Sequence, residues 1–181
     1  MNPEVLLSEK RKDIVKQWFD AAIDAYPAES GKFFKKTSDP FANPVGNTIH
    51  RSLNNLFDEV IKIEMDPTAV RNALDGIVRV QSVQEFQPSA AIGFVFSIKP
   101  SILKCVKKHH DDKAVEKYLT ALDVNIEQIL KTAFDLYMEC RQKVFLLRAN
   151  QARDRVRQLL VKKGYIEEIP EKGVNLEDII A

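Results

Sequence analysis

The chain has 181 residues, of which 45% are hydrophobic and 29% charged, with a formal net charge of +1. This balance is typical of one soluble domain with a real core. No apolar run approaches the roughly 18 residues of a membrane span, and the polar start MNPEVLLSEKRKD predicts no secretory signal. We therefore expect a cytoplasmic protein without membrane insertion.

Helical periodicity covers nearly the whole sequence, which predicts an all-α fold. Four cap-plus-proline pairs mark helix starts: Asn2-Pro3, Asn43-Pro44, Asp66-Pro67 and Gln87-Pro88. In chain order we expect a helix from Pro3 to Pro27, a polar connector, helices beginning at Pro44 and Pro67, and a central apolar helix from Pro88 that kinks or breaks at Pro100.

A last helix runs from Asp112 to about Lys163, with a break expected near Asp123 to Asn125. One apolar seam on it consists of Ile126, Ala133, Tyr137, Cys140, Val144 and Leu147, and a second, rotated seam of Phe145, Ala149, Ala152, Val156 and Leu159. Such a helix is too long for one small domain to cover, so its far half must meet another chain, the tail or water. The predicted domain is residues 1–150, followed by a helix extension and acidic tail, 151–181.

The charges are unevenly placed near the C-terminus. Residues 141–163 hold eight Lys or Arg and one acid, whereas residues 167–178 hold five acids and one Lys. Because the acids lie so close in the chain, we favour a solvated basic helix partly neutralised by the tail over a nucleic-acid surface. Asn175 is expected to cap a short terminal helix.

The sequence contains no recognisable catalytic motif: no GxGxxG, P-loop, GxSxG or HExxH occurs. The HHDD run at 109–112 is explained by helix-end preferences, so no metal site is predicted. Cys105 and Cys140 are expected to be reduced core thiols. No residue in the sequence therefore supports an enzymatic function.

A cofactor or ligand site has two sets of candidates. On a helical wheel, His50 falls at the flank of the buried stripe, beside Phe57 and Ile61. A boundary histidine is the preferred interpretation, and a haem ligand the alternative. Phe41, Phe57, Phe94 and Phe96 are candidates for lining a small apolar pocket, although core packing is the preferred interpretation of these residues.

A family resemblance is carried by several segments in order. These are Trp18, Tyr26-Pro27, DPFANPVG (39–46), VRVQSVQEFQPSAAIGFVFSIK (78–99) and AFDLYMECR (133–141). Together they resemble the N-terminal domain of RsbR-type co-antagonists, regulators associated with the stressosome, and most of all the RsbRD-like domain, over roughly residues 10–150.

The resemblance implies a globin-like helical fold without haem that acts as a sensor or signal-input module and tends to dimerise. Longer members continue into a STAS output domain; residues 164–181 are too few for one, so we expect a stand-alone module. The leading hypothesis is a non-enzymatic, homodimeric stress-response regulator that passes its state through the last helix to an unidentified protein. The alternatives are a haem-binding globin-type sensor and an adaptor that docks through the basic helix, 141–163.

Overall fold

The computed structural model describes residues 3–36, 39–84, 86–107 and 113–166. Within these ranges the regular elements are all helical, which confirms the predicted all-α fold with a long C-terminal helix. The chain separates into two compact units, Met1–Gln142 and Lys143–Ala181, whereas the sequence suggested a boundary at residue 150. The last helix belongs to both units.

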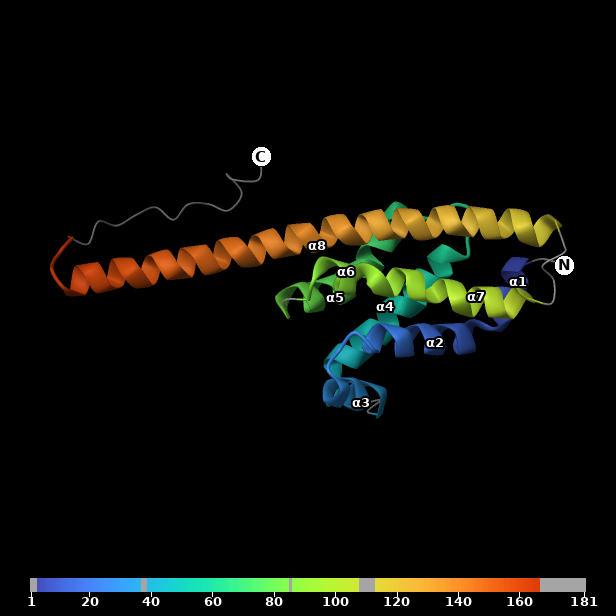
Figure 1. The fold of residues 1–181 in the computed structure, drawn as a ribbon, viewed down its shortest axis with the longest axis horizontal. Helices are drawn as coiled ribbons and strands as arrows, with labels where there is room; N and C mark the ends of the chain where they lie inside the picture. Colours follow the sequence, from blue (N-terminus) through green and yellow to red (C-terminus); the bar gives the residue numbers. More distant parts are fainter. Residues whose placement is uncertain (1–2, 37–38, 85, 108–112, 167–181) are drawn as a thin grey trace. The chain divides into compact units, whose positions relative to one another are not determined.

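The helices follow one another with short connections (Figure 1). They are α1 (Pro3–Glu9), α2 (Arg11–Ile23), α3 (Ala28–Lys36), α4 (Pro44–Val60), α5 (Pro67–Val83), α6 (Pro88–Ile92), the 3₁₀-helix η1 (Gly93–Ser97), α7 (Ile98–Val106) and α8 (Lys113–Lys162). The helix predicted from Pro3 is therefore two helices that are interrupted at Lys10. The predicted polar connector contains α3, whose one buried residue is Gly31.

Proline marks the first turn of α4, α5 and α6, as the sequence predicted. The Asn43 side chain accepts a hydrogen bond from the backbone N–H of Gly46 (2.9 Å), and Asp66 accepts one from Thr68 (2.9 Å). These bonds satisfy backbone donors that have no partner within the first helical turn. Gln87 makes no such bond before α6.

The predicted central apolar helix is divided into α6, η1 and α7. Pro100 lies in the first turn of α7, where it has no N–H to donate to the preceding turn, and the 3₁₀ segment stands just before it. Phe94 and Val95 of η1 are buried, and the Phe94 carbonyl accepts a hydrogen bond from Trp18 Nε1 (2.7 Å). The break is therefore anchored in the core.

The same stretch, Pro88–Val106, is long and apolar enough by length and composition to cross a membrane, with a hydropathy of 1.4. The sequence-based prediction rested on unbroken apolar runs and did not identify this stretch, which Lys99, Pro100 and Lys104 interrupt. However, its buried residues, among them Ala91, Ile98 and Ile102, belong to the hydrophobic core of the first unit. A core helix passes the same test, so the composition alone is weak evidence for a span.

α4 and α5 pack closely against each other. A Cβ atom on Gly76 would lie 2.9 Å from Ser52 Oγ and 3.0 Å from Thr48 Cγ2. Glycine at this position of α5 therefore allows the two helices to approach. Leu53 and Leu56 of α4 and Leu74 of α5 are fully buried.

The break predicted near Asp123 does not occur, because α8 is continuous from Lys113 to Lys162. Instead, two side chains of this region bond to the end of α4. Asn125 Nδ2 donates to the carbonyls of Val60 (3.0 Å) and Lys62 (2.7 Å), and the Tyr118 hydroxyl donates to that of Ile61 (2.7 Å). α8 thus caps the C-terminus of α4. It ends at the predicted stop, with Gly164 at φ +72°.

Tyr26 is a buried tyrosine with a different environment. Its ring packs against Phe34 (5.3 Å between centroids) and Phe86 (4.9 Å). Its hydroxyl and the Oε1 of buried Gln81 have no hydrogen-bond partner among the described residues. Burial raises the pKa of Tyr26 to about 12, and the nearby Gln81 side chain offsets part of this rise.

The two tyrosines predict different responses to loss of the hydroxyl. Tyr118→Phe leaves the Ile61 carbonyl without its donor, so we expect a loss of about 1 kcal/mol in the free energy of unfolding. Tyr26→Phe removes a buried hydroxyl whose one polar neighbour is the Gln81 side chain, so its loss should be smaller than that of Tyr118→Phe. Urea unfolding at neutral pH measures both. Equal losses in the two variants would contradict this assignment.

The raised pKa of Tyr26 also predicts sensitivity to alkali. In the unfolded chain the phenol ionises near 10.0, whereas in the folded chain it keeps its proton until about 12. Between these values the unfolded state binds fewer protons, so stability falls as the pH rises and is unaffected by this group below the lower value. Burial raises the pKa of Tyr118 in the same direction, so Tyr26→Phe should remove only part of the fall. Denaturant unfolding at increasing pH tests this, and an unchanged slope in Tyr26→Phe would contradict it.

Candidate functional site

A pocket of about 250 Å³ lies in the first unit at the start of α4. It is lined by residues of α2, α3 and α4 and of the turn that precedes α4: Phe19, Phe34, Lys35, Asn43, Gly46, Asn47 and His50. Two aromatic rings contribute its apolar surface. The sequence named only His50 among these residues as a site candidate.

Asn43 organises the wall of this pocket. It is 1% exposed, and its Nδ2 donates to the Phe34 carbonyl (2.9 Å) while its Oδ1 accepts from the Gly46 N–H (2.9 Å). Its own carbonyl accepts from Asn47 Nδ2 (2.8 Å). A Cβ on Gly46 would lie 2.4 Å from Asn43 Nδ2, so a side chain does not fit there without displacing this amide. The segment DPFANPVGN is thus explained by helix capping and by the tie to α3.

His50 lies at the exposed edge of the pocket. Its ring meets Phe19 edge-on, with 5.7 Å between centroids, and its Nδ1 is 3.3 Å from Asn54 Nδ2. The Asn54 amide also donates to the His50 carbonyl (2.9 Å). These contacts match the boundary histidine that the helical wheel predicted.

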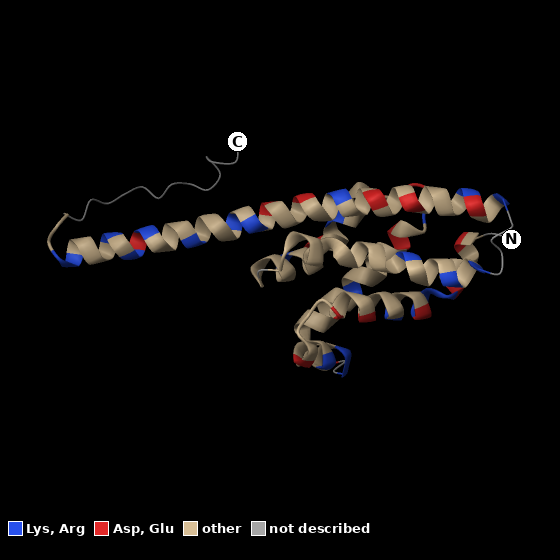
Figure 2. Cartoon of the chain, viewed as in Figure 1, with Lys and Arg blue, Asp and Glu red and all other residues tan. Residues whose placement is uncertain are grey.

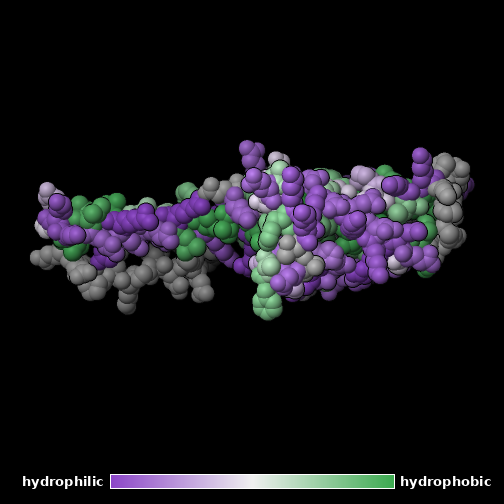
Figure 3. Space-filling model, turned by 90° about the horizontal axis from the view of Figure 1, so that it is seen from below, coloured by the Kyte–Doolittle hydropathy of each residue, from purple (hydrophilic) through white to green (hydrophobic). Residues whose placement is uncertain are grey.

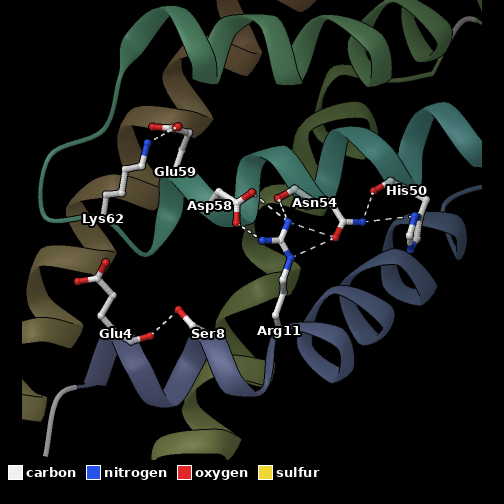
Figure 4. Close-up of polar contacts among 8 residues, drawn as sticks. All are labelled: Glu4, Ser8, Arg11, His50, Asn54, Asp58, Glu59 and Lys62. Carbon is white, nitrogen blue, oxygen red and sulfur yellow. Dashed lines mark hydrogen bonds and ion pairs between the residues drawn. The ribbon is translucent and has the colours of Figure 1, made fainter.

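The polar side chains that begin with His50 and Asn54 continue along α4 to Asp58 (Figure 4). Arg11 at the start of α2 forms a two-point ion pair with the Asp58 carboxylate, and its Nη2 donates to the Asn54 carbonyl (3.0 Å). Its guanidinium also lies 5.7 Å from the centroid of the Phe57 ring. Fork-to-carboxylate geometry of this kind orients the partners, and here it holds α2 against α4.

The pocket suits a small molecule better than a haem. Its volume lies below the roughly 300–1,000 Å³ of typical ligand sites. Lys35 on its rim is paired with Asp24 (2.9 Å), whose hydrogen bond raises the lysine pKa. A haem pocket needs apolar walls around its axial ligand, whereas His50 is exposed and has amide neighbours. The site geometry therefore gives no support to the haem alternative.

The four predicted pocket phenylalanines do not share one environment. Phe41 is 96% exposed and Phe96 is 52% exposed, whereas Phe57 and Phe94 are core residues. Phe41 points into water because the turn 39–42 stands outside the core, and neither Phe57 nor Phe94 lines the pocket at the start of α4. Phe19 and Phe34 were missed, since Phe19 reads as an ordinary core residue and Phe34 as part of a connector.

Metal binding gains no candidate from the structure. Among the described residues no group of three or more His, Cys, Asp or Glu is placed to hold an ion. The HHDD run at 109–112 lies outside the described residues, as do the acidic tail and the helix predicted after Asn175. Cys105 and Cys140 are free and half-buried, and burial raises the pKa of the Cys105 thiol.

The predicted interface seam on α8 is partly buried and partly exposed. Ile126, Ala133 and Tyr137 are buried in the core of the first unit, and the Tyr137 hydroxyl donates to the Phe86 carbonyl. These three side chains are already covered by their own chain, so they are not open to a second one. The remaining seam residues are half-buried (Cys140, Val144) or exposed (Leu147, Ala152, Val156, Leu159).

A family comparison agrees with this architecture. The family model described as the RsbT co-antagonist protein rsbRD N-terminal domain matches residues 12–152. The chain belongs to this RsbRD N-terminal domain family. The match covers α2 to α7 and most of α8, and so includes both the pocket and the capped end of α4. No curated protein and no solved structure matches the chain.

Within this RsbRD domain, mutation can separate the two roles of the Asn43 side chain, which caps α4 and bonds to α3. Asn43→Ser keeps a capping oxygen but loses the donor to Phe34, so we expect a cost of about 1 kcal/mol. Asn43→Ala loses both bonds and should cost about 2 kcal/mol or more. His50→Ala, at the exposed edge, is the control and should change stability little. Urea midpoints give the order, and equal costs for the Ser and Ala variants would show that the cap contributes nothing.

Proposed function

We propose that this RsbRD domain is a sensory or regulatory module that acts on a protein partner through the distal surface of α8. We define the distal surface as the exposed side chains of residues 143–162. The observation that carries the proposal is the division of one continuous helix: its first part supplies core residues such as Ile129 and Leu136, while its last part exposes Phe145 (71%), Val156 (56%) and Leu159 (61%).

Exposed apolar side chains in a row are costly to leave in water and commonly mark an interaction surface. Hydrophobic (green) atoms lie beside hydrophilic ones along this part of the helix (Figure 3). A regulatory role for the family supports a partner as the occupant, and the lack of any catalytic motif supports a non-enzymatic role. A change in the packing around α8 in the core would shift or rotate the helix as a unit.

The predicted homodimer remains part of the proposal, but on a narrower surface. With Ile126, Ala133 and Tyr137 in the core, a second copy has the exposed residues in the first part of α8 left to contact. These include Phe134 (44%) and Met138 (47%), which the sequence seams omitted.

The distal surface is tested by paired variants of the full chain. Val156→Asp with Leu159→Asp should remove the partner from affinity captures made in the native organism, because a charge replaces each apolar contact. Val124→Asp, at a 49% exposed position in the first part of α8, is the matched control and should retain it. Light scattering on the same three proteins reports whether a homodimer forms and which variant dissociates it. Identical captures from all three proteins would refute the proposal.

A further inference from the structure

The distal surface of α8 carries a single regular apolar stripe. It consists of Phe145, Ala149, Ala152, Val156 and Leu159, which follow one another at alternating spacings of four and three residues. This is the period at which a helix presents one seam to an elongated partner. All five residues are exposed, so the described part of the chain does not cover the stripe.

Basic residues border this stripe on both sides. Arg148, Arg155 and Lys162 follow one flank at seven-residue intervals, while Arg153 and Arg157 lie on the other. Lys and Arg outnumber acids by seven to one between Lys143 and Lys163, with Asp154 as the one acid (Figure 2). A second copy docked on the stripe would bring basic flank against basic flank in either orientation, which is unfavourable. The charge pattern therefore selects an acidic, amphipathic occupant.

The chain itself contains a segment of this chemistry. Residues 167–181, EEIPEKGVNLEDIIA, hold five acids and one Lys. Their apolar residues are Ile169, Val174, Leu176, Ile179 and Ile180. Fifteen residues reach about 50 Å when extended, whereas the twenty helical residues 143–162 span about 30 Å. The segment is thus long enough to follow the whole stripe.

The connection between the two is short. α8 ends in a helix stop at which the Gly164 N–H bonds to the Val161 carbonyl (2.9 Å) and the Tyr165 N–H to that of Leu160 (3.0 Å). Only Ile166 then precedes the acidic segment. A tether of this length gives an effective concentration in the millimolar range, so even weak docking would be well populated.

We propose that residues 167–181 dock on the distal surface of α8, with their acids against its basic flanks and their apolar residues on the stripe. The segment then acts as an internal competitor for this surface. Its regulatory consequence, that a partner must displace the tail, rests on the function proposed above; the docking itself does not.

Energy transfer within the full chain tests the docking. Dyes are placed on Gln151→Cys and Ala181→Cys in a Cys105→Ser, Cys140→Ser background. We expect high transfer at low salt that falls in about 1 M salt, where charges are screened beyond about 3 Å. The control is an isosteric neutral tail with Glu167, Glu168, Glu171 and Glu177 changed to Gln and Asp178 to Asn. Its transfer should stay below that of the acidic tail at low salt and should not change with salt concentration. Circular dichroism confirms that each variant folds.

Equal transfer in the acidic and neutral tails would overturn the proposal. Transfer between singly labelled chains after mixing, without transfer inside one chain, would assign the surface to the tail of a second copy instead and also overturn it. Arg155→Glu with Lys162→Glu should lower the transfer of the acidic tail. The partner capture with distal variants does not depend on the tail. Failure of the docking therefore remains distinguishable from failure of the proposed function.

Discussion

The carbonyl groups at the C-terminus of α4 need hydrogen-bond donors, and α8 provides them. Three successive carbonyls, those of Val60, Ile61 and Lys62, receive bonds from Asn125 and Tyr118. A helix end that is buried without donors would lose about 1–3 kcal/mol for each unsatisfied group. Because the two donors lie two turns apart on α8, they determine the register of that helix against α4. The position of every later α8 residue within the first unit follows from this contact.

An amide side chain performs the same task at the other end of α4. Asn43 caps the first turn and also bonds to the last part of α3. α4 is thereby held at both ends by groups outside its own helical bonds, and Arg11 holds its C-terminal half to α2. This arrangement explains why polar residues lie in and around the candidate pocket. They build the helix ends, and the space between them is what a ligand would occupy.

The sequence predicted the features that are encoded locally. Cap-plus-proline pairs identified the starts of α4, α5 and α6, and periodicity identified the helical class. The sequence-based predictions were wrong or incomplete where tertiary contacts determine the structure. Asn125 suggested a break because asparagine is a poor helix former, but two carbonyls from another helix stabilise it in place. Phe41 and Phe57 are the same residue type and equally hydrophobic. Only the fold places Phe41 in water and Phe57 in the core. The pocket was missed because its walls come from three separate helices.

The contacts that hold α8 also limit the motions by which it could transmit a signal. Its apolar seams look alike in the sequence, but Ile126, Ala133 and Tyr137 of the first seam are buried in the core, whereas the second seam is exposed. A slide of α8 by one turn would break the bonds from Asn125 and Tyr118 together, and would bury unsatisfied carbonyls at the end of α4. Coupling by such a slide is therefore expensive. A smaller rotation, or a change in how firmly α8 is held, costs less. An occupant of the distal surface can shift that equilibrium only by binding the two states with different affinity.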